Sequence, residues 1–131
     1  MTRSHLEAIL EAFVLPRNGD LSKVESLLRE DVVWQGLRED YVCHDRREVL
    51  DILRPLGRVP DEHIELVQQG DKVVLGMGGT GFDRVADIPV EGQLFQVFTF
   101  EGDKVVHMQD YLTREEALAA AGAIESAMWR G

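Results

Sequence analysis

The stretch VFTFEGDKVVHMQDYLTREEALAA, residues 97–120, decides the fold class. Two runs rich in β-branched, aromatic and apolar residues flank a Glu-Gly-Asp turn, and an Ala- and Glu-rich segment follows. Apolar runs around a short glycine turn are typical of a β-hairpin, and Thr113 with Glu116 can satisfy the free amides of a first helical turn. The stretch therefore predicts two antiparallel strands and a closing helix.

A second hairpin is predicted earlier in the chain. The run EHIELVQQ (62–69) is followed by the turn residues Gly70 and Asp71 and then by KVVLGMGGT (72–80). Both runs are apolar and rich in β-branched residues, as strands are. Two shorter stretches, DVVWQG (31–36) and DYVCH (40–44), are expected to pair with each other.

The glycines of the second hairpin match a dinucleotide fingerprint only formally. Gly76, Gly78 and Gly81 have the required spacing, but FDRVADIP (82–89) follows where a helix should begin. The fingerprint needs a strand, a tight turn and a helix in that order. We therefore interpret these glycines as a site where the strand bends.

Helix starts are marked by a short polar residue with Glu three positions later, a pattern that caps the first turn. Besides the closing helix, this pattern occurs at Ser4–Glu7, Ser22–Glu25 and Asp45–Glu48. Helices thus come early and antiparallel strands come late. The order predicts an α+β fold in which helices pack on one face of a curved sheet.

Composition limits the possible functions. The 131 residues suit a single domain spanning 1–131, and the net charge of −10 disfavours nucleic acid and anionic membranes as partners. One cysteine, Cys43, excludes an internal disulfide and fits the cytoplasm. No apolar run is long enough for a membrane span. The four histidines lie on different elements without metal-ligand spacing, so we expect no metal and no cofactor.

The order of segments resembles a known superfamily. An N-terminal helical pair, then REDVVWQG (29–36), VCHDRREVLDIL (42–53), a long hairpin and the 97–120 ending are similar to the nuclear transport factor 2-like superfamily, in its SnoaL-like branch. The resemblance covers nearly the whole chain. It implies a cone-shaped, curved antiparallel sheet of the cystatin-like α+β type, wrapped around the N-terminal helices, with a mostly apolar cavity. It also implies a homodimer formed through the convex face of the sheet.

Asp110 is the candidate catalytic residue. Strand alternation places it on a face with Val106, Met108 and Leu112, opposite His107. A carboxyl among apolar side chains has a raised pKa and can act as a general acid or base. The resemblance points the same way, because SnoaL-like cyclases carry an Asp on this last long strand. The alternative is that Asp110 only bonds to local backbone amides near the strand end.

The cavity implied by the resemblance would be lined by residues from several strands. Trp34 either lines it or fills the core, and His44 either contributes a polar end with Tyr41 or lies on the surface, with Cys43 pointing the other way. Alternation does not decide which face of strand 93–100 looks inward. The candidate substrate-binding residues are Trp34, Tyr41, His44, Met77, Phe95, Phe98 and Met108.

Two functions from different classes follow. The first is a cofactor-independent enzyme of cyclase or isomerase type that acts on a small hydrophobic, oxygenated molecule through Asp110. The second is a non-catalytic ligand-binding or accessory domain that uses the same pocket, because few polar residues are expected inside it. A protein-interaction domain is less favoured, since the chain has no evident partner motif. Fold resemblance alone does not choose between these functions.

Overall fold

The computed structural model describes residues 4–14, 20–54, 63–78, 84–85, 88–89 and 93–122. Within these ranges the helical elements are α1 (His5–Ile9), the π-helix η1 (Leu10–Val14), α2 (Ser22–Leu27), α3 (Arg46–Leu53) and α4 (Arg114–Ala121). The strands are β1 (Leu28–Gln35), β2 (Val42–Cys43), β3 (His63–Gln69), β4 (Lys72–Gly78), β5 (Arg84–Val85), β6 (Ile88–Pro89), β7 (Gln93–Glu101) and β8 (Lys104–Tyr111). None of these helices is long and apolar enough to cross a membrane.

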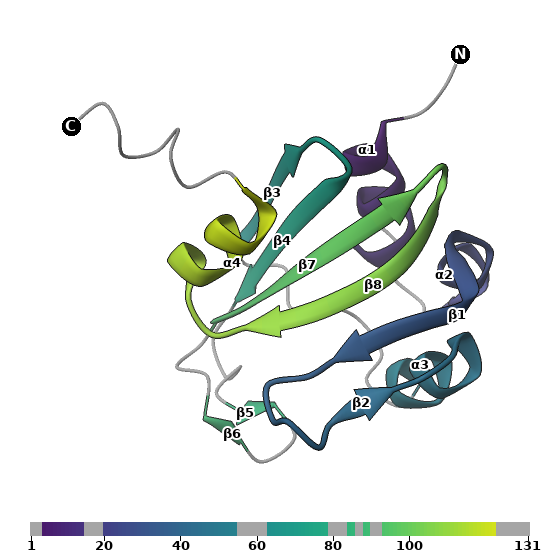
Figure 1. Cartoon of the computed structure of the whole chain (residues 1–131), viewed down its shortest axis with the longest axis horizontal. Helices are drawn as coiled ribbons and strands as arrows, with labels where there is room; N and C mark the ends of the chain where they lie inside the picture. The colour runs from purple at the N-terminus through teal and green to yellow at the C-terminus, as the bar shows by residue number, and fades with distance from the viewer. Residues whose placement is uncertain are drawn as a thin grey trace.

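The main sheet is curved and has six strands in the order β2–β1–β8–β7–β4–β3, while β5 and β6 pair separately (Figure 1). Both predicted hairpins, β3–β4 and β7–β8, are present, and β1 pairs with β2 as expected. The prediction of an antiparallel sheet needs one correction, because β1 and β8 run parallel. These two strands come from opposite ends of the chain, and no local turn fixes their direction. The sheet is therefore mixed.

Local capping signals explain where most helices begin. Ser4 and Glu7 form a full capping box at α1, and the side chains of Asp45 and Thr113 each accept a hydrogen bond from a backbone amide three residues later. Such caps satisfy amides that have no partner within the helix. The predicted closing helix is confirmed as far as Ala121; its expected continuation lies outside the described residues.

The Ser22–Glu25 pair was wrongly predicted to cap α2. Leu21 occupies the N-cap position without a side-chain hydrogen bond, and Ser22 is the first helical residue. The Asp20 carboxylate accepts a hydrogen bond of 2.9 Å from the Ser22 amide instead. The polar residue that satisfies this helix start therefore lies two positions earlier than the sequence pattern indicated.

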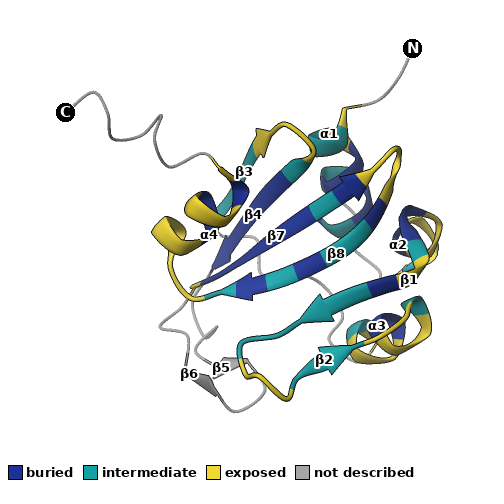
Figure 2. Ribbon diagram, viewed as in Figure 1, coloured by how far each residue is buried: buried dark blue, intermediate teal, exposed yellow. Residues whose placement is uncertain are grey.

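The sheet packs on both faces. We call the face covered by α1, η1, α2 and α3 the inner face and the face covered by α4 the outer face. Buried residues of the inner core include Ile9, Val32, Val49, Val73, Leu75, Leu94, Phe98, Val105 and Met108. Those of the outer core are Val74, Phe95, Val97, Ala117, Leu118 and Ala121. Figure 2 shows that burial concentrates on the central strands β4, β7 and β8.

The position of α4 corrects the prediction that all helices pack on one face. Its Ala117, Leu118 and Ala121 belong to the outer core with Phe95 and Val97 of β7, and Figure 1 shows α4 and α1 on opposite sides of the sheet. Both apolar faces of β7 are thus partly covered by the chain itself, one in the inner core and the other by α4. The homodimer through this face stays a prediction.

A β-bulge interrupts β8. The register between β7 and β8 shifts by one residue, which leaves Val106 without a partner in the ladder. Val105 consequently lies in the inner core, although simple alternation predicted it on the face of His107. Beyond the bulge the predicted alternation holds, so Met108 and Asp110 share the inner face. Bulges commonly change side-chain direction in this way.

Gly76 is explained by a close ring contact on the outer face. It pairs with Phe95 across β4 and β7, and a Cβ built on Gly76 would lie 2.7 Å from Cε2 of the Phe95 ring. No side chain fits there unless the ring moves. The sequence predicts a bend at this glycine, and the structure adds a second reason for it, because the Phe95 ring occupies the space that a side chain would need.

Gly76→Ala should therefore destabilise the protein by about 1–2 kcal/mol, because overpacking outweighs the gain in β-propensity. Urea unfolding of the variant measures this loss. In a Phe95→Leu background, where the ring is absent, the same substitution should cost little or nothing. Equal costs in both backgrounds would show that Phe95 is not the cause.

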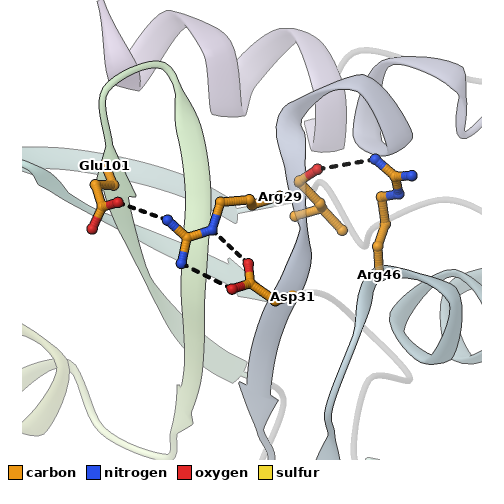
Figure 3. Close-up of polar contacts among 5 residues, drawn as sticks. Arg29, Asp31, Arg46 and Glu101 are labelled. Atoms are coloured by element: carbon orange, nitrogen blue, oxygen red, sulfur yellow. Dashed lines mark hydrogen bonds and ion pairs between the residues drawn. The ribbon is translucent and has the colours of Figure 1, made fainter.

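Polar contacts tie the start of β1 to its surroundings (Figure 3). The Arg29 guanidinium donates to Asp31 on the same strand and, at 2.7 Å, to Glu101 at the end of β7. Arg46 of α3 reaches the backbone carbonyl of Leu28 at 3.5 Å. The ion pairs of Arg29 with Asp31 and Glu101 join exposed side chains, so solvent screens them and they add little to stability. Their effect is to fix where β1 lies rather than to hold the fold together.

Candidate functional site

Asp110 lies on the inner face in the middle of the sheet. It belongs to β8, which has β1 on one side and β7 on the other, and it pairs directly with Gln96 of β7. Only 6% of Asp110 is exposed, and Asp110 and Gln96 are the two buried polar residues of the described chain. The prediction that Asp110 projects among apolar side chains is therefore supported by its burial.

Both hydrogen bonds to this carboxyl group converge on one oxygen. The indole Nε1 of Trp34 donates to Oδ1 at 2.8 Å, and the amide Nε2 of Gln96 donates to the same Oδ1 at 2.9 Å. No described residue bonds to Oδ2. Of the described side chains, only His5 has a fully buried polar atom without a partner, so the unpaired Oδ2 of Asp110 keeps some exposure.

Burial raises the pKa of Asp110 from 3.8 to about 6, and the hydrogen bonds from Trp34 and Gln96 oppose that rise. No lysine, arginine or histidine of the described ranges forms an ion pair with it. A carboxyl with neutral donors and no counter-ion loses its proton near neutral pH. It can therefore hold or release a proton under ordinary cellular conditions.

Three further predicted residues lie on the face of Asp110. Met108 and Phe98 are fully buried in the inner core, and Met77 at the end of β4 is 7% exposed. Phe98 pairs with Met108 across β7 and β8, two residues along the ladder from the Gln96–Asp110 pair. Together with Trp34 they belong to the inner core, on the face of the sheet where Asp110 lies.

Sequence comparison gives no match, but structure comparison does. No protein-family model and no curated protein matches the chain. An uncharacterised cystatin-fold protein from Novosphingobium aromaticivorans is 24% identical, with 84% of this chain and 99% of that chain covered and a TM-score of 0.61. An NTF2-like protein of unknown function from Cytophaga hutchinsonii is 9% identical, with 85% and 91% covered and a TM-score of 0.60.

A third solved structure is of a protein with a ketosteroid isomerase-like fold from Catenulispora acidiphila, in complex with trimethylamine. It is 17% identical, with 93% of this chain and 95% of that chain covered and a TM-score of 0.52. The chain has the nuclear transport factor 2-like fold. The fold predicted from the order of its segments is thus confirmed.

Two predicted site residues, Phe95 and His44, lie away from Asp110. Phe95 is on the outer face against α4, because it alternates with Gln96 along β7. The His44 side chain is 75% exposed and contacts Glu48 at 3.5 Å, so it takes the surface alternative. Tyr41 lies against Gly36, with the Arg38 guanidinium 4.8 Å from the centre of its ring, and its role in the site stays a prediction. The sequence analysis included Phe95 and His44 because strand alternation alone does not show which side of the sheet each side chain lies on.

Two residues of the site were missed from the sequence. Gln96 lies on strand 93–100, whose inward face alternation does not decide, and its side-chain amide donates a hydrogen bond to Asp110. Cys43 was expected to point away, but it pairs with Trp34 across β1 and β2 and packs against the inner core. Burial raises the pKa of the Cys43 thiol, with smaller effects from Glu48 and Asp110. Only the strand register, which no local signal gives, would have found them.

A hollow of about 360 Å³ lies elsewhere on this fold, over α2, β1 and α3. Its lining residues are Glu25, Glu30, Asp45, Arg46, Arg47, Leu50, Asp51 and Arg54. Acidic and basic side chains alternate there, and Arg54 already pairs with Asp51. The described part of the chain contains no cluster of three potential metal ligands. The apolar cavity beside Asp110 stays a prediction.

Proposed function

We propose that this protein binds a small hydrophobic, oxygenated molecule at the inner face of its sheet and that Asp110 exchanges a proton with it. The observation that carries the proposal is the buried Asp110 carboxyl, which has no counter-ion among the described residues and one oxygen left unpaired. A reaction of the cyclase or isomerase type without a cofactor suits such a group. Asp110 would be its acid and base in turn.

The chemistry follows from the two protonation states of one carboxyl. The carboxylate removes a proton from a carbon next to a substrate carbonyl, and the resulting acid returns that proton to the substrate at a second position or to the carbonyl oxygen. The carboxyl ends in the state in which it began, so no other reactant is needed. A pKa of about 6 makes both states accessible near neutral pH.

A binding domain without turnover is the second candidate. It is favoured by the neighbours of Asp110, because the indole of Trp34, the amide of Gln96 and the thiol of Cys43 include no second acid or base matched to neutral pH. Many carbonyl reactions use a second group to stabilise the developing oxyanion. An experiment must therefore separate binding from proton transfer.

α-Tetralone is a suitable probe, because it is a neutral bicyclic ketone with exchangeable protons next to its carbonyl. We expect the wild type to accelerate exchange of these protons for deuterium in heavy water by about a hundredfold over buffer, the low end of general-base catalysis. The rate should rise with pH through about 6, since the carboxylate is the base. Proton NMR of the probe follows this exchange directly.

Asp110→Asn is the decisive variant, and tetralin, which lacks the carbonyl oxygen, is the matched probe for binding. Loss of exchange in Asp110→Asn with tetralone binding retained supports acid/base function. Binding of tetralone and tetralin without any exchange in the wild type supports the binding domain instead. Exchange that is equal in wild type and Asp110→Asn removes Asp110 from the mechanism.

A further inference from the structure

Asp110 and the two side chains that donate hydrogen bonds to it come from three neighbouring strands. Asp110 on the central strand β8 receives Trp34 from β1 on one side and Gln96 from β7 on the other. The two N–H donors approach the same carboxyl oxygen from strands that are fixed by the sheet. The orientation of this carboxyl is thus set by backbone elements on both sides of it.

Two donors on one oxygen decide where the carboxyl proton goes. Oδ1 already accepts hydrogen bonds at 2.8 and 2.9 Å, so its lone pairs are engaged and it takes the role of the carbonyl oxygen. A protonated carboxyl has one O–H donor, which must then reside on Oδ2. The amide orientation of Gln96 is fixed in the same way, because only its Nε2 can donate to a carboxylate.

We propose that Gln96 is a positioning residue: with Trp34 it holds Oδ1 of Asp110 and makes Oδ2 the single oxygen that carries the proton to and from the ligand. This inference rests on the proposed function of Asp110. It also defines the ligand further. A neutral carbonyl compound, whose oxygen accepts one hydrogen bond from Oδ2, fits the protonated site, whereas a carboxylate ligand would face a buried group of like charge.

A positioning role of Gln96 can be distinguished from a packing role, because its side chain is buried and also donates a hydrogen bond to Asp110. Gln96 is 7% exposed, and its side chain has one hydrogen bond in the described structure, the one to Asp110. Leucine would fill a similar space without the donor. If Gln96 served packing alone, leucine would replace it without effect on the carboxyl. If Gln96 positions Asp110, the same replacement should change the titration midpoint and the C=O stretch of the Asp110 carboxyl.

The test compares Gln96→Leu and Trp34→Phe, which each remove one donor to Oδ1, with the control Gln109→Leu. Gln109 is the neighbour of Asp110 on β8 but faces the opposite way. Two properties of Asp110 are measured. One is the titration midpoint of its carboxyl carbon by NMR, and the other is the infrared C=O stretch of its protonated form, identified by its absence in Asp110→Asn.

We expect each donor-removing variant to raise the titration midpoint by about one pH unit, because a hydrogen bond to the charged form is lost. The C=O stretch should move to higher frequency, since Oδ1 loses a donor, and the midpoint of the tetralone exchange profile should rise in parallel. Gln109→Leu should leave all three unchanged. Trp34→Phe keeps the test valid if Gln96→Leu fails to fold.

The outcomes separate this inference from the proposed function. If Asp110→Asn abolishes tetralone exchange but Gln96→Leu and Trp34→Phe leave the midpoint and the C=O stretch as in the wild type, Asp110 acts and the positioning role is wrong. If Asp110→Asn leaves exchange intact, the proposed function itself is wrong. A shift that Gln109→Leu reproduces would assign the effect to general loosening of β8 and also overturn the inference.

Discussion

Asp110→Asn should be more stable than the wild type near pH 8, by up to about 3 kcal/mol, and nearly equal to it near pH 4. The folded-state pKa of Asp110, about 6, lies above the ordinary value of 3.8. The unfolded chain therefore ionises first. Stability of the wild type falls as pH rises from 3.8 through about 6, because in that range the folded state holds a proton that the unfolded state has lost, and it is level above about 6, where neither state holds the proton.

The magnitude follows from the gap between these two pKa values, since each unit corresponds to about 1.4 kcal/mol. Asparagine can keep the hydrogen bonds from Trp34 and Gln96 through its own carbonyl oxygen, so the variant loses the buried charge and little else. Urea unfolding of both proteins at several pH values measures the difference.

Asp51→Asn is the matched control, because Asp51 lies on the surface of α3 with 59% of its side chain exposed. The same change of charge at this exposed position relieves no burial, so it should not reproduce the stabilisation expected for Asp110→Asn near pH 8. A constant offset between wild type and Asp110→Asn at all pH values would contradict the burial of an ionising Asp110.

A carboxyl that lowers stability at neutral pH is not explained by folding. Leucine or asparagine would be better at this inner-face position, and yet the chain places Asp110 there with two donors arranged around it. Proteins commonly lose stability where a group must stay reactive. Asp110→Asn, the variant that should gain stability, is therefore also the variant that should lose proton exchange.

The sequence predicted the local features of this fold well. Hairpins and helix caps depend on residues within a few positions of one another, so the turn at Gly102 and the cap at Thr113 could be recognised directly. Asp110 was found for a similar reason, because one acidic residue in an apolar strand face is conspicuous. The order of the segments then sufficed for the fold.

Features that depend on distant pairing could not be predicted. The parallel contact of β1 with β8 sets Trp34 beside Met108 and allows it to reach Asp110, and nothing near Trp34 in the sequence indicates this. The apolar alternation of β7 gave no signal for its inner face either, so Phe95 was included among the candidate site residues and Gln96 was not. The face on which a side chain lies follows from the register of its strand, and that register depends on the pairing of the whole sheet.

Phe98→Ala is the second large effect that we expect, a loss of about 4 kcal/mol in the free energy of unfolding. Phe98 is fully buried, pairs with Val73 on one side and Met108 on the other, and its ring lies 4.9 Å from that of Phe13 in η1. It thus connects three strands to the N-terminal helical segment. Removal of a buried phenylalanine side chain costs about 3–5 kcal/mol, because apolar contacts are lost and a cavity remains.

Urea unfolding measures this loss, and Phe98→Leu is its control, since leucine keeps most of the volume and should cost roughly a third as much. Because Phe98 and Gln96 share the inner face of β7, Phe98→Ala also tests whether the core beside Asp110 is rigid. A cost below about 1 kcal/mol would mean that the inner face collapses easily around the missing ring. The surroundings that bury Asp110 would then be too adaptable to hold its pKa near 6, and the acid/base proposal would lose its structural basis.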